Sequence, residues 1–137
     1  MQREATDRRA PLLRLDHVAL VAIVAVFVGT FSTWATAGPV TLNGVQGPND
    51  GWLVVILAAC AVGWARLMLR GSWLGVIGVL GTALVIVWTV YEDRRDARDV
   101  LGASTGHGLL LVVAGGIVLG ATAVAAGIGL ARSRRHS

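Results

Sequence analysis

The residues of this chain that could do chemistry lie away from the centres of its apolar segments. Four long apolar runs dominate the sequence, and they cover residues 18–37, 52–69, 73–91 and 108–131. No Asp, Glu or His falls in the central part of any run, although a proton relay or an enzyme site inside a membrane needs such groups. The three histidines do not have the spacing that supplies several ligands to a metal, and they are His17, His107 and His136. The sequence therefore predicts no catalytic residue, metal site, cofactor or small-molecule substrate, and it indicates that the chain is not an enzyme.

Arg66 is the one charged residue inside an apolar run. It precedes Arg70 by about one helical turn, which places it roughly 6 Å deeper along a helix axis. Two interpretations of Arg66 remain open. Its guanidinium can snorkel to the headgroups at the inner end of the helix, which is the interpretation we favour, or it can pair with Asp16 at the inner end of the first run. Such an ion pair would join the first two helices at one face of the membrane.

The composition predicts that the solvent of this chain is a lipid bilayer. Hydrophobic residues make up 55% of the chain and charged residues 15%, whereas globular proteins have about 25% charged residues. Each run has enough residues, at about 1.5 Å of rise per residue, to cross all or most of a hydrocarbon core about 30 Å thick. The predicted fold is therefore all-α, a polytopic membrane protein with a four-transmembrane-helix bundle.

The arginines predict the orientation, since positive residues near the ends of spans stay on the cytoplasmic side. The predicted inner segments are the tails 1–17 and 132–137 and the turn 70–72, and the predicted outer loops are 38–51 and 92–107. With Arg66 at the inner end of the second run included, nine of the twelve basic residues, all of them Arg, lie inside with three acidic residues, and three lie outside with five acidic residues. The net charge of +4 thus divides into +6 inside and −2 outside. We expect a multi-pass plasma (inner) membrane protein with both termini cytoplasmic, and no nucleic-acid partner, because there is no basic face with interleaved aromatic residues.

The aromatic residues predict the same orientation independently. Trp and Tyr favour the headgroup boundary, where an apolar ring and a polar N–H or O–H are both satisfied. The predicted interfacial anchors at the outer boundary are Trp34, Trp52, Trp88 and Tyr91, and the predicted anchor at the inner boundary is Trp73. Two patterns, one of charge and one of aromatic rings, therefore predict one topology.

Small residues are the main clue to how the helices pack. Apolar side chains gain little by leaving lipid for each other, so helix association in a bilayer depends on close backbone approach at small residues. The predicted packing glycines follow helical spacing, and they are Gly71, Gly75, Gly78 and Gly81 before and in the third run, and Gly116, Gly120 and Gly127 in the fourth. The second run has a shorter version, Ala59 and Gly63, and if Gly71 instead takes the C′ position of a helix cap, the first set begins at Gly75. Spacing leaves open whether these faces meet within one chain or between copies.

Two local patterns lie around the end of the first run. The turn signal Asn43-Gly44, with short apolar flanks, predicts a small hairpin in the first outer loop. Ala35-Thr36-Ala37 has the small-x-small form of a signal peptidase site, so cleavage there is a competing interpretation. The run is longer than the usual apolar region of a signal peptide, about 7–15 residues, and we therefore expect it to be kept as a span.

Three segments of the chain carry a family resemblance. They are TWATAGPV at the end of the first run, GPNDGWLVV at the start of the second, and STGHGLLLVVAGGIVLGA at the start of the last. With these segments the chain resembles the small four-span integral membrane proteins of actinobacteria that have no assigned function. The resemblance covers most of the chain, implies a location in the plasma membrane, and supplies no catalytic residue to transfer.

The function that these patterns favour is interaction within the membrane. We expect an accessory protein that packs through glycine-lined helix faces, either as a homo-oligomer or as part of a larger heteromeric membrane complex. The alternative is a small transporter or channel formed by oligomerisation, which would need a polar stripe along one helix. The polar residues available for such a stripe are scattered, and they are Thr30, Ser32, Thr33, Thr82, Thr89 and Thr122.

Overall fold

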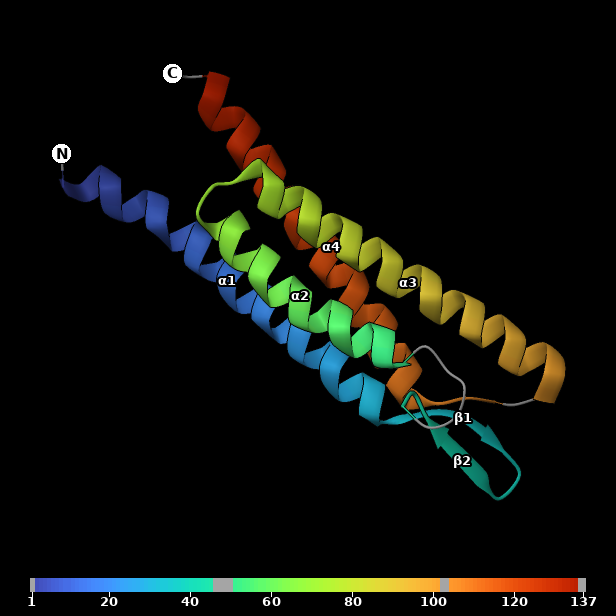
Figure 1. The fold of residues 1–137 in the computed structure, drawn as a ribbon. Coiled ribbons are helices and arrows are strands. Elements are labelled where there is room, and N and C mark those ends of the chain that lie inside the picture. Colours follow the sequence, from blue (N-terminus) through green and yellow to red (C-terminus); the bar gives the residue numbers. More distant parts are fainter. Residues whose placement is uncertain (1, 46–50, 102–103, 136–137) are drawn as a thin grey trace.

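The chain is mostly helical in the computed structural model, which describes residues 2–45, 51–101 and 104–135, with side chains for 15–45, 51–95 and 104–135. Within these residues there are four helices and one small sheet (Figure 1). The elements in chain order are α1 (Gln2–Phe31), β1 (Thr33–Ala37), β2 (Val40–Asn43), α2 (Gly51–Leu69), α3 (Trp73–Leu101), β3 (Ser104–Thr105) and α4 (His107–Arg135).

Three helices are long and apolar enough to cross a membrane, namely α2, α3 over Trp73–Arg95, and α4. The apolar part of α1 is shorter and covers Leu15–Phe31. At about 1.5 Å per residue this part is about 26 Å long, slightly less than a hydrocarbon core of about 30 Å. The membrane character predicted from the composition is thus confirmed at the level of three helices.

The first helix ends at Phe31, whereas the predicted first span continues to residue 37. Its last turn is closed by two donors that share one carbonyl oxygen. The backbone N–H of Ser32 donates to the Gly29 carbonyl at 3.2 Å, and the indole N–H of Trp34 donates to the same carbonyl at 2.9 Å. Carbonyls in the last turn of a helix have no partner within the helix, so Trp34 caps α1 and the chain turns into β1. Two predictions are corrected here, because residues 33–37 form a strand and Trp34 is a buried cap, 3% exposed, rather than an interfacial anchor.

A three-stranded antiparallel sheet lies at the end of α1, with the order β2-β1-β3. Ala37 pairs with Val40 across a turn at Gly38, whose φ of 58° is the left-handed conformation that glycine adopts without strain. The predicted hairpin around Asn43-Gly44 is therefore wrong, because the turn lies earlier and Asn43 is the last residue of β2. On its other edge β1 pairs with β3, so the all-α prediction misses a sheet that joins the α1–α2 connection to the α3–α4 connection.

The turn between α2 and α3 is built around Gly71, which has a φ of 79°. The N–H of Gly71 donates to the Met68 carbonyl at 2.9 Å, and the N–H of Ser72 donates to the Leu67 carbonyl at 3.1 Å. These are the two hydrogen bonds of a Schellman motif, in which a left-handed glycine occupies the C′ position. Gly71 therefore belongs to the turn, and the small-residue face of α3 begins at Gly75.

The four helices pack side by side, each mainly against two neighbours. Helices α1 and α3 are both in contact with α4 and with α2. In Figure 1 the N-terminal end of α1, the C-terminal end of α4 and the α2–α3 turn lie together, and we call this the terminal end. The sheet lies at the opposite end of the helices, which we call the sheet end.

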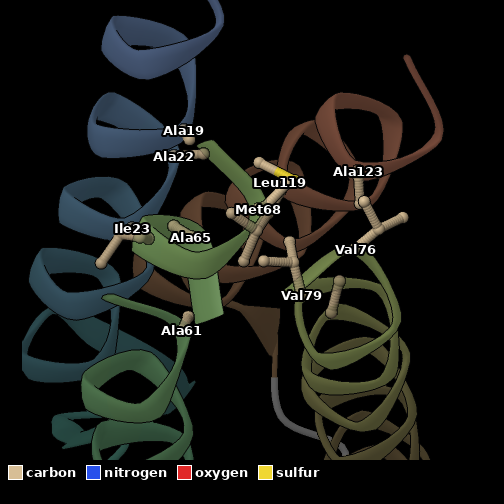
Figure 2. Packing of buried hydrophobic residues seen from close by; sticks show 11 residues of the cluster. Ala19, Ala22, Ile23, Ala61, Ala65, Met68, Val76, Val79, Leu119 and Ala123 are labelled. Carbon is tan, nitrogen blue, oxygen red and sulfur yellow. The ribbon is translucent and has the colours of Figure 1, made fainter. Parts of the chain in front are cut away.

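Two clusters of buried apolar side chains fill the space between the helices. The cluster toward the terminal end is rich in small side chains around Met68 (Figure 2), and its alanines are Ala19, Ala22, Ala61, Ala65, Ala83 and Ala123. The cluster toward the sheet end has larger side chains, among them Val26, Trp34, Val54, Ile86, Val90 and Val112. Small side chains let helix axes approach closely in the first cluster, whereas Trp34 connects the second cluster to the sheet, because it belongs to β1.

The substitution Trp34→Phe tests the cap of α1. It removes one of the two N–H groups that donate to the Gly29 carbonyl, so we expect the free energy of unfolding to fall by about 1 kcal/mol. The matched control is Trp88→Phe, because Trp88 also donates an indole hydrogen bond, to Glu92 at 3.1 Å, but is 66% exposed. Thermal unfolding in detergent measures both variants. A lower Tm for Trp34→Phe alone supports the cap, and equal losses for the two variants contradict it.

Candidate functional site

Helices α1 and α4 meet at glycines on both sides of their interface. A Cβ added to Gly29 would lie 2.8 Å from the Gly108 carbonyl oxygen, and a Cβ added to Gly108 would lie 2.6 Å from the Gly29 carbonyl oxygen. Two turns further along α4, a Cβ added to Gly115 would lie 2.8 Å from the Ala22 carbonyl oxygen. Real Cβ atoms essentially never come this close to a backbone atom, so the two backbones are in direct contact at these positions.

Helices α2 and α3 meet near the terminal end through two of the predicted glycines. A Cβ added to Gly75 would lie 2.6 Å from the Leu67 carbonyl carbon and 2.7 Å from the Met68 Cα, so α3 rests against the backbone of α2. One turn later, a Cβ added to Gly78 would lie within 2.6 Å of the Trp64 ring, which lies over this glycine. The third predicted glycine of this helix differs, because a Cβ added to Gly81 would meet nothing within 4 Å.

Helices α3 and α4 meet along the glycine face predicted for the fourth run. A Cβ added to Gly116 would lie 2.9 Å from Val87, one added to Gly127 would lie 3.3 Å from Val76, and one added to Gly120 would lie 3.6 Å from the Ala83 Cβ. The contact is tight at Gly116 and Gly127, and it is of ordinary van der Waals length at Gly120. The predicted glycines of the fourth run therefore lie in an interface within the chain.

The α1–α4 interface is the part of the packing that the sequence reasoning missed. Its glycines are Gly29, Gly108 and Gly115. The available signal is the spacing of Gly108 and Gly115, since seven residues are two turns and place both on one helix face. The predicted set follows steps of three and four along one face of α4, whereas α4 carries two glycine faces and the consecutive pair Gly115-Gly116 belongs to different ones.

The remaining predicted anchors differ in their surroundings. Trp52, Trp88 and Tyr91 are exposed and lie toward the sheet end of α2 and α3, as side chains at a headgroup boundary would. Trp73 is half-buried at the terminal end, and the Arg134 guanidinium lies over its ring at 6.0 Å from the centroid. This cation–π contact joins the start of α3 to the last turn of α4.

Three of the four buried threonine hydroxyls donate hydrogen bonds inside their own helices. The hydroxyl of Thr30 donates to the Val26 carbonyl at 2.8 Å. The hydroxyls of Thr82 and Thr122 donate in the same way, one turn back along their helices, also at 2.8 Å. These hydroxyls therefore do not line a polar route between the helices. Among the residues that the structure describes, no three His, Cys, Asp or Glu side chains gather in a way that could hold a metal ion.

A cavity of about 360 Å³ lies between α1 and α2 near the terminal end. It is lined by Asp16, His17, Ala19, Leu20, Ile23, Val62, Ala65, Arg66 and Leu69. The structure thus brings both members of the predicted inner-face pair, Asp16 and Arg66, to one cavity. Their charged groups form no ion pair with each other there, so the pairing itself stays a prediction. None of the described glycines packs α1 against α2, and the cavity lies between these two helices.

Comparison of the chain with protein-family models, with curated proteins and with solved structures finds no match. The features of the molecule that bear on its function are therefore the geometry of the helices, the open glycine positions and the cavity.

The pair Gly75→Ala and Gly81→Ala tests the glycine contacts on one helix. The first substitution pushes a methyl group into the backbone of α2, so we expect the free energy of unfolding to fall by about 1–3 kcal/mol, the usual cost of overpacking. The second meets open space and replaces glycine by a better helix former, so we expect no loss of stability. Thermal unfolding in one detergent compares the variants. A Gly81→Ala variant as unstable as Gly75→Ala would refute the assignment of the interface.

Proposed function

We propose that this chain is an integral plasma-membrane protein with four spans and cytoplasmic termini, and that it serves as an interaction or accessory subunit. In this proposal α1 crosses the membrane together with α2, α3 and α4, although its apolar part is the shortest of the four. Two observations support its inclusion. It packs along α4, which is long enough to cross a membrane, and its outward side chains are apolar, among them Leu20, Val21, Val24 and Phe27. Apolar side chains on the outer face of a helix are stable in lipid and costly in water.

The distribution of charge supports the proposed orientation. Among the residues whose side chains the structure describes, the terminal end carries one acidic residue, Asp16, and five arginines, which are Arg66, Arg70, Arg132, Arg134 and Arg135. Toward the sheet end, α3 carries acidic and basic residues together. Those with described side chains are Glu92, Asp93, Arg94 and Arg95. Positive residues near span ends stay in the cytoplasm, so the terminal end is the cytoplasmic one in this proposal.

The observation that carries the proposed interaction function is a small-residue face left open by the fold. Contacts within the chain occupy most of the predicted glycines, but Ala59 and Gly63 of α2 are exposed, and a Cβ added to Gly63 would meet nothing within 4 Å. These two residues lie one turn apart on the outer surface of α2, next to the exposed Val62. Small residues at this spacing let another helix approach closely in a bilayer. We therefore propose that this face of α2 receives a helix of a partner subunit or of a second copy.

Affinity purification in a mild detergent, followed by mass spectrometry and sizing, tests the proposed function. We expect the chain to be recovered with a stoichiometric membrane partner or as a homo-oligomer, and Gly63→Ile to reduce that association at least fivefold by blocking close approach. The matched control is Ala121→Ile, since Ala121 is exposed on α4, away from the α2 face.

Three outcomes would contradict this function. The chain could be monomeric and without a partner, the two variants could associate equally well, or the purified homo-oligomer could conduct a solute in liposomes. The last result would establish the alternative, a small oligomeric transporter or channel.

A further inference from the structure

We propose that the cavity between α1 and α2 binds one phospholipid whose headgroup carries both a phosphate and a primary ammonium, as phosphatidylethanolamine does. The inference rests on the proposed insertion into a bilayer. The cavity has a volume of about 360 Å³, within the range of about 300–1,000 Å³ that is usual for small-ligand sites. Val62 lines the cavity and is next to Gly63, so the cavity and the open face around Gly63 adjoin each other on α2.

Most residues that line the cavity are apolar, and the cavity opens onto the outer surface of α1 and α2. Leu20, Ile23, Val62 and Leu69 contribute the aliphatic walls. Leu20 is 58% exposed and Val62 is 38% exposed, so the cavity reaches the outer surface, where lipid chains lie in the proposed orientation. An acyl chain fits this lining, because an aliphatic chain makes dispersion contacts with such walls and needs no hydrogen-bond partner.

The charged residues of the lining favour a headgroup with two charges. Arg66 of α2 offers a guanidinium, which binds phosphate with two parallel hydrogen bonds. Asp16 of α1 offers a carboxylate, which accepts hydrogen bonds from an ammonium group. Because the two side chains form no ion pair with each other in the structure, both can face a ligand held between the helices.

This charge pair also discriminates between lipids. An anionic headgroup such as phosphatidylglycerol satisfies Arg66 but brings negative charge close to Asp16, which costs free energy in a medium of low dielectric constant. The quaternary ammonium of phosphatidylcholine has no N–H to donate to the carboxylate. A primary ammonium next to a phosphate is the headgroup that satisfies both residues.

The position of Arg66 agrees with the depth of a headgroup phosphate. It lies in the last turn of α2, about one turn before Arg70 at the end of the helix, and the cavity is near the terminal end. Its long side chain can reach the boundary between acyl chains and headgroups from this depth. The lipid would then lie in the cytoplasmic leaflet and fill the space that α1 and α2 leave open.

Native mass spectrometry of the protein, released from vesicles with equal amounts of phosphatidylethanolamine, phosphatidylglycerol and phosphatidylcholine, tests this site. We expect phosphatidylethanolamine to be retained preferentially, and Arg66→Gln to reduce its retention at least fivefold. The matched control is Arg70→Gln. It removes the same charge at a residue that lies one turn from Arg66 and does not line the cavity. We expect Asp16→Asn to shift retention toward phosphatidylglycerol, because it removes the repulsion of an anionic headgroup.

A second variant separates loss of binding from loss of folding. Val62→Trp fills the cavity from a partly exposed wall, so we expect it to reduce lipid retention with an unchanged Tm in detergent. Phosphoethanolamine without acyl chains should not displace the lipid at millimolar concentration, since it lacks the contact with the aliphatic walls. Displacement by it would assign the site to a soluble phosphate ester instead.

The outcomes that would overturn the lipid site differ from those that would overturn the proposed membrane function. Equal retention in Arg66→Gln and Arg70→Gln, or a preference of the unaltered protein for phosphatidylglycerol, refutes the site. Release of the protein from membranes by alkaline carbonate refutes its insertion, whatever the lipid result. A chain that stays in the membrane and binds no lipid selectively therefore refutes the lipid site alone.

Discussion

Direct contact between helix backbones is the constraint on which the remaining structure depends. In a bilayer, burying one apolar side chain against another gains little, so helices associate where they come close enough for many dispersion contacts. Helix α4 meets this condition on two adjacent faces, with Gly108 and Gly115 toward α1 and Gly116 and Gly127 toward α3. Helix α3 then holds α2 through Gly75. The α1–α2 pair closes the arrangement without a glycine contact, and there the cavity is found.

Much of the helical structure could be predicted from the sequence, because long apolar runs with charged ends predict helices of sufficient length to cross a membrane. The end of α1 could not be predicted in the same way. The run stays uncharged through Trp34 and Ala37, and hydropathy does not distinguish a helix from a buried strand. What ends the helix is the indole N–H of Trp34 reaching back to the Gly29 carbonyl, a contact that exists only in three dimensions.

For the packing glycines, too, the sequence predicts the helix face, whereas the three-dimensional structure decides which helix covers it. Spacing places Gly75 and Gly78 on one face of α3, and both lie against α2. Gly81 follows the same spacing and faces open space, since α2 does not cover that position. Spacing identifies a face, but which helix covers it depends on the arrangement of all four. The sequence places Asp16 and Arg66 at the inner ends of the first two runs, and the fold brings both residues to one cavity without an ion pair between them.

The small sheet has a consequence for the order of assembly. β1 and β2 are synthesised early, whereas the third strand comes much later in the chain, as the separation of 68 positions between Thr36 and Ser104 illustrates. Until then one edge of β1 exposes unpaired backbone groups. If α3 and α4 entered a membrane in the reverse orientation, Ser104 and Thr105 would lie on the side opposite to β1, and this edge would stay open. In the proposed four-span topology, the third strand can therefore pair with β1 only when both helix pairs are inserted in the same sense.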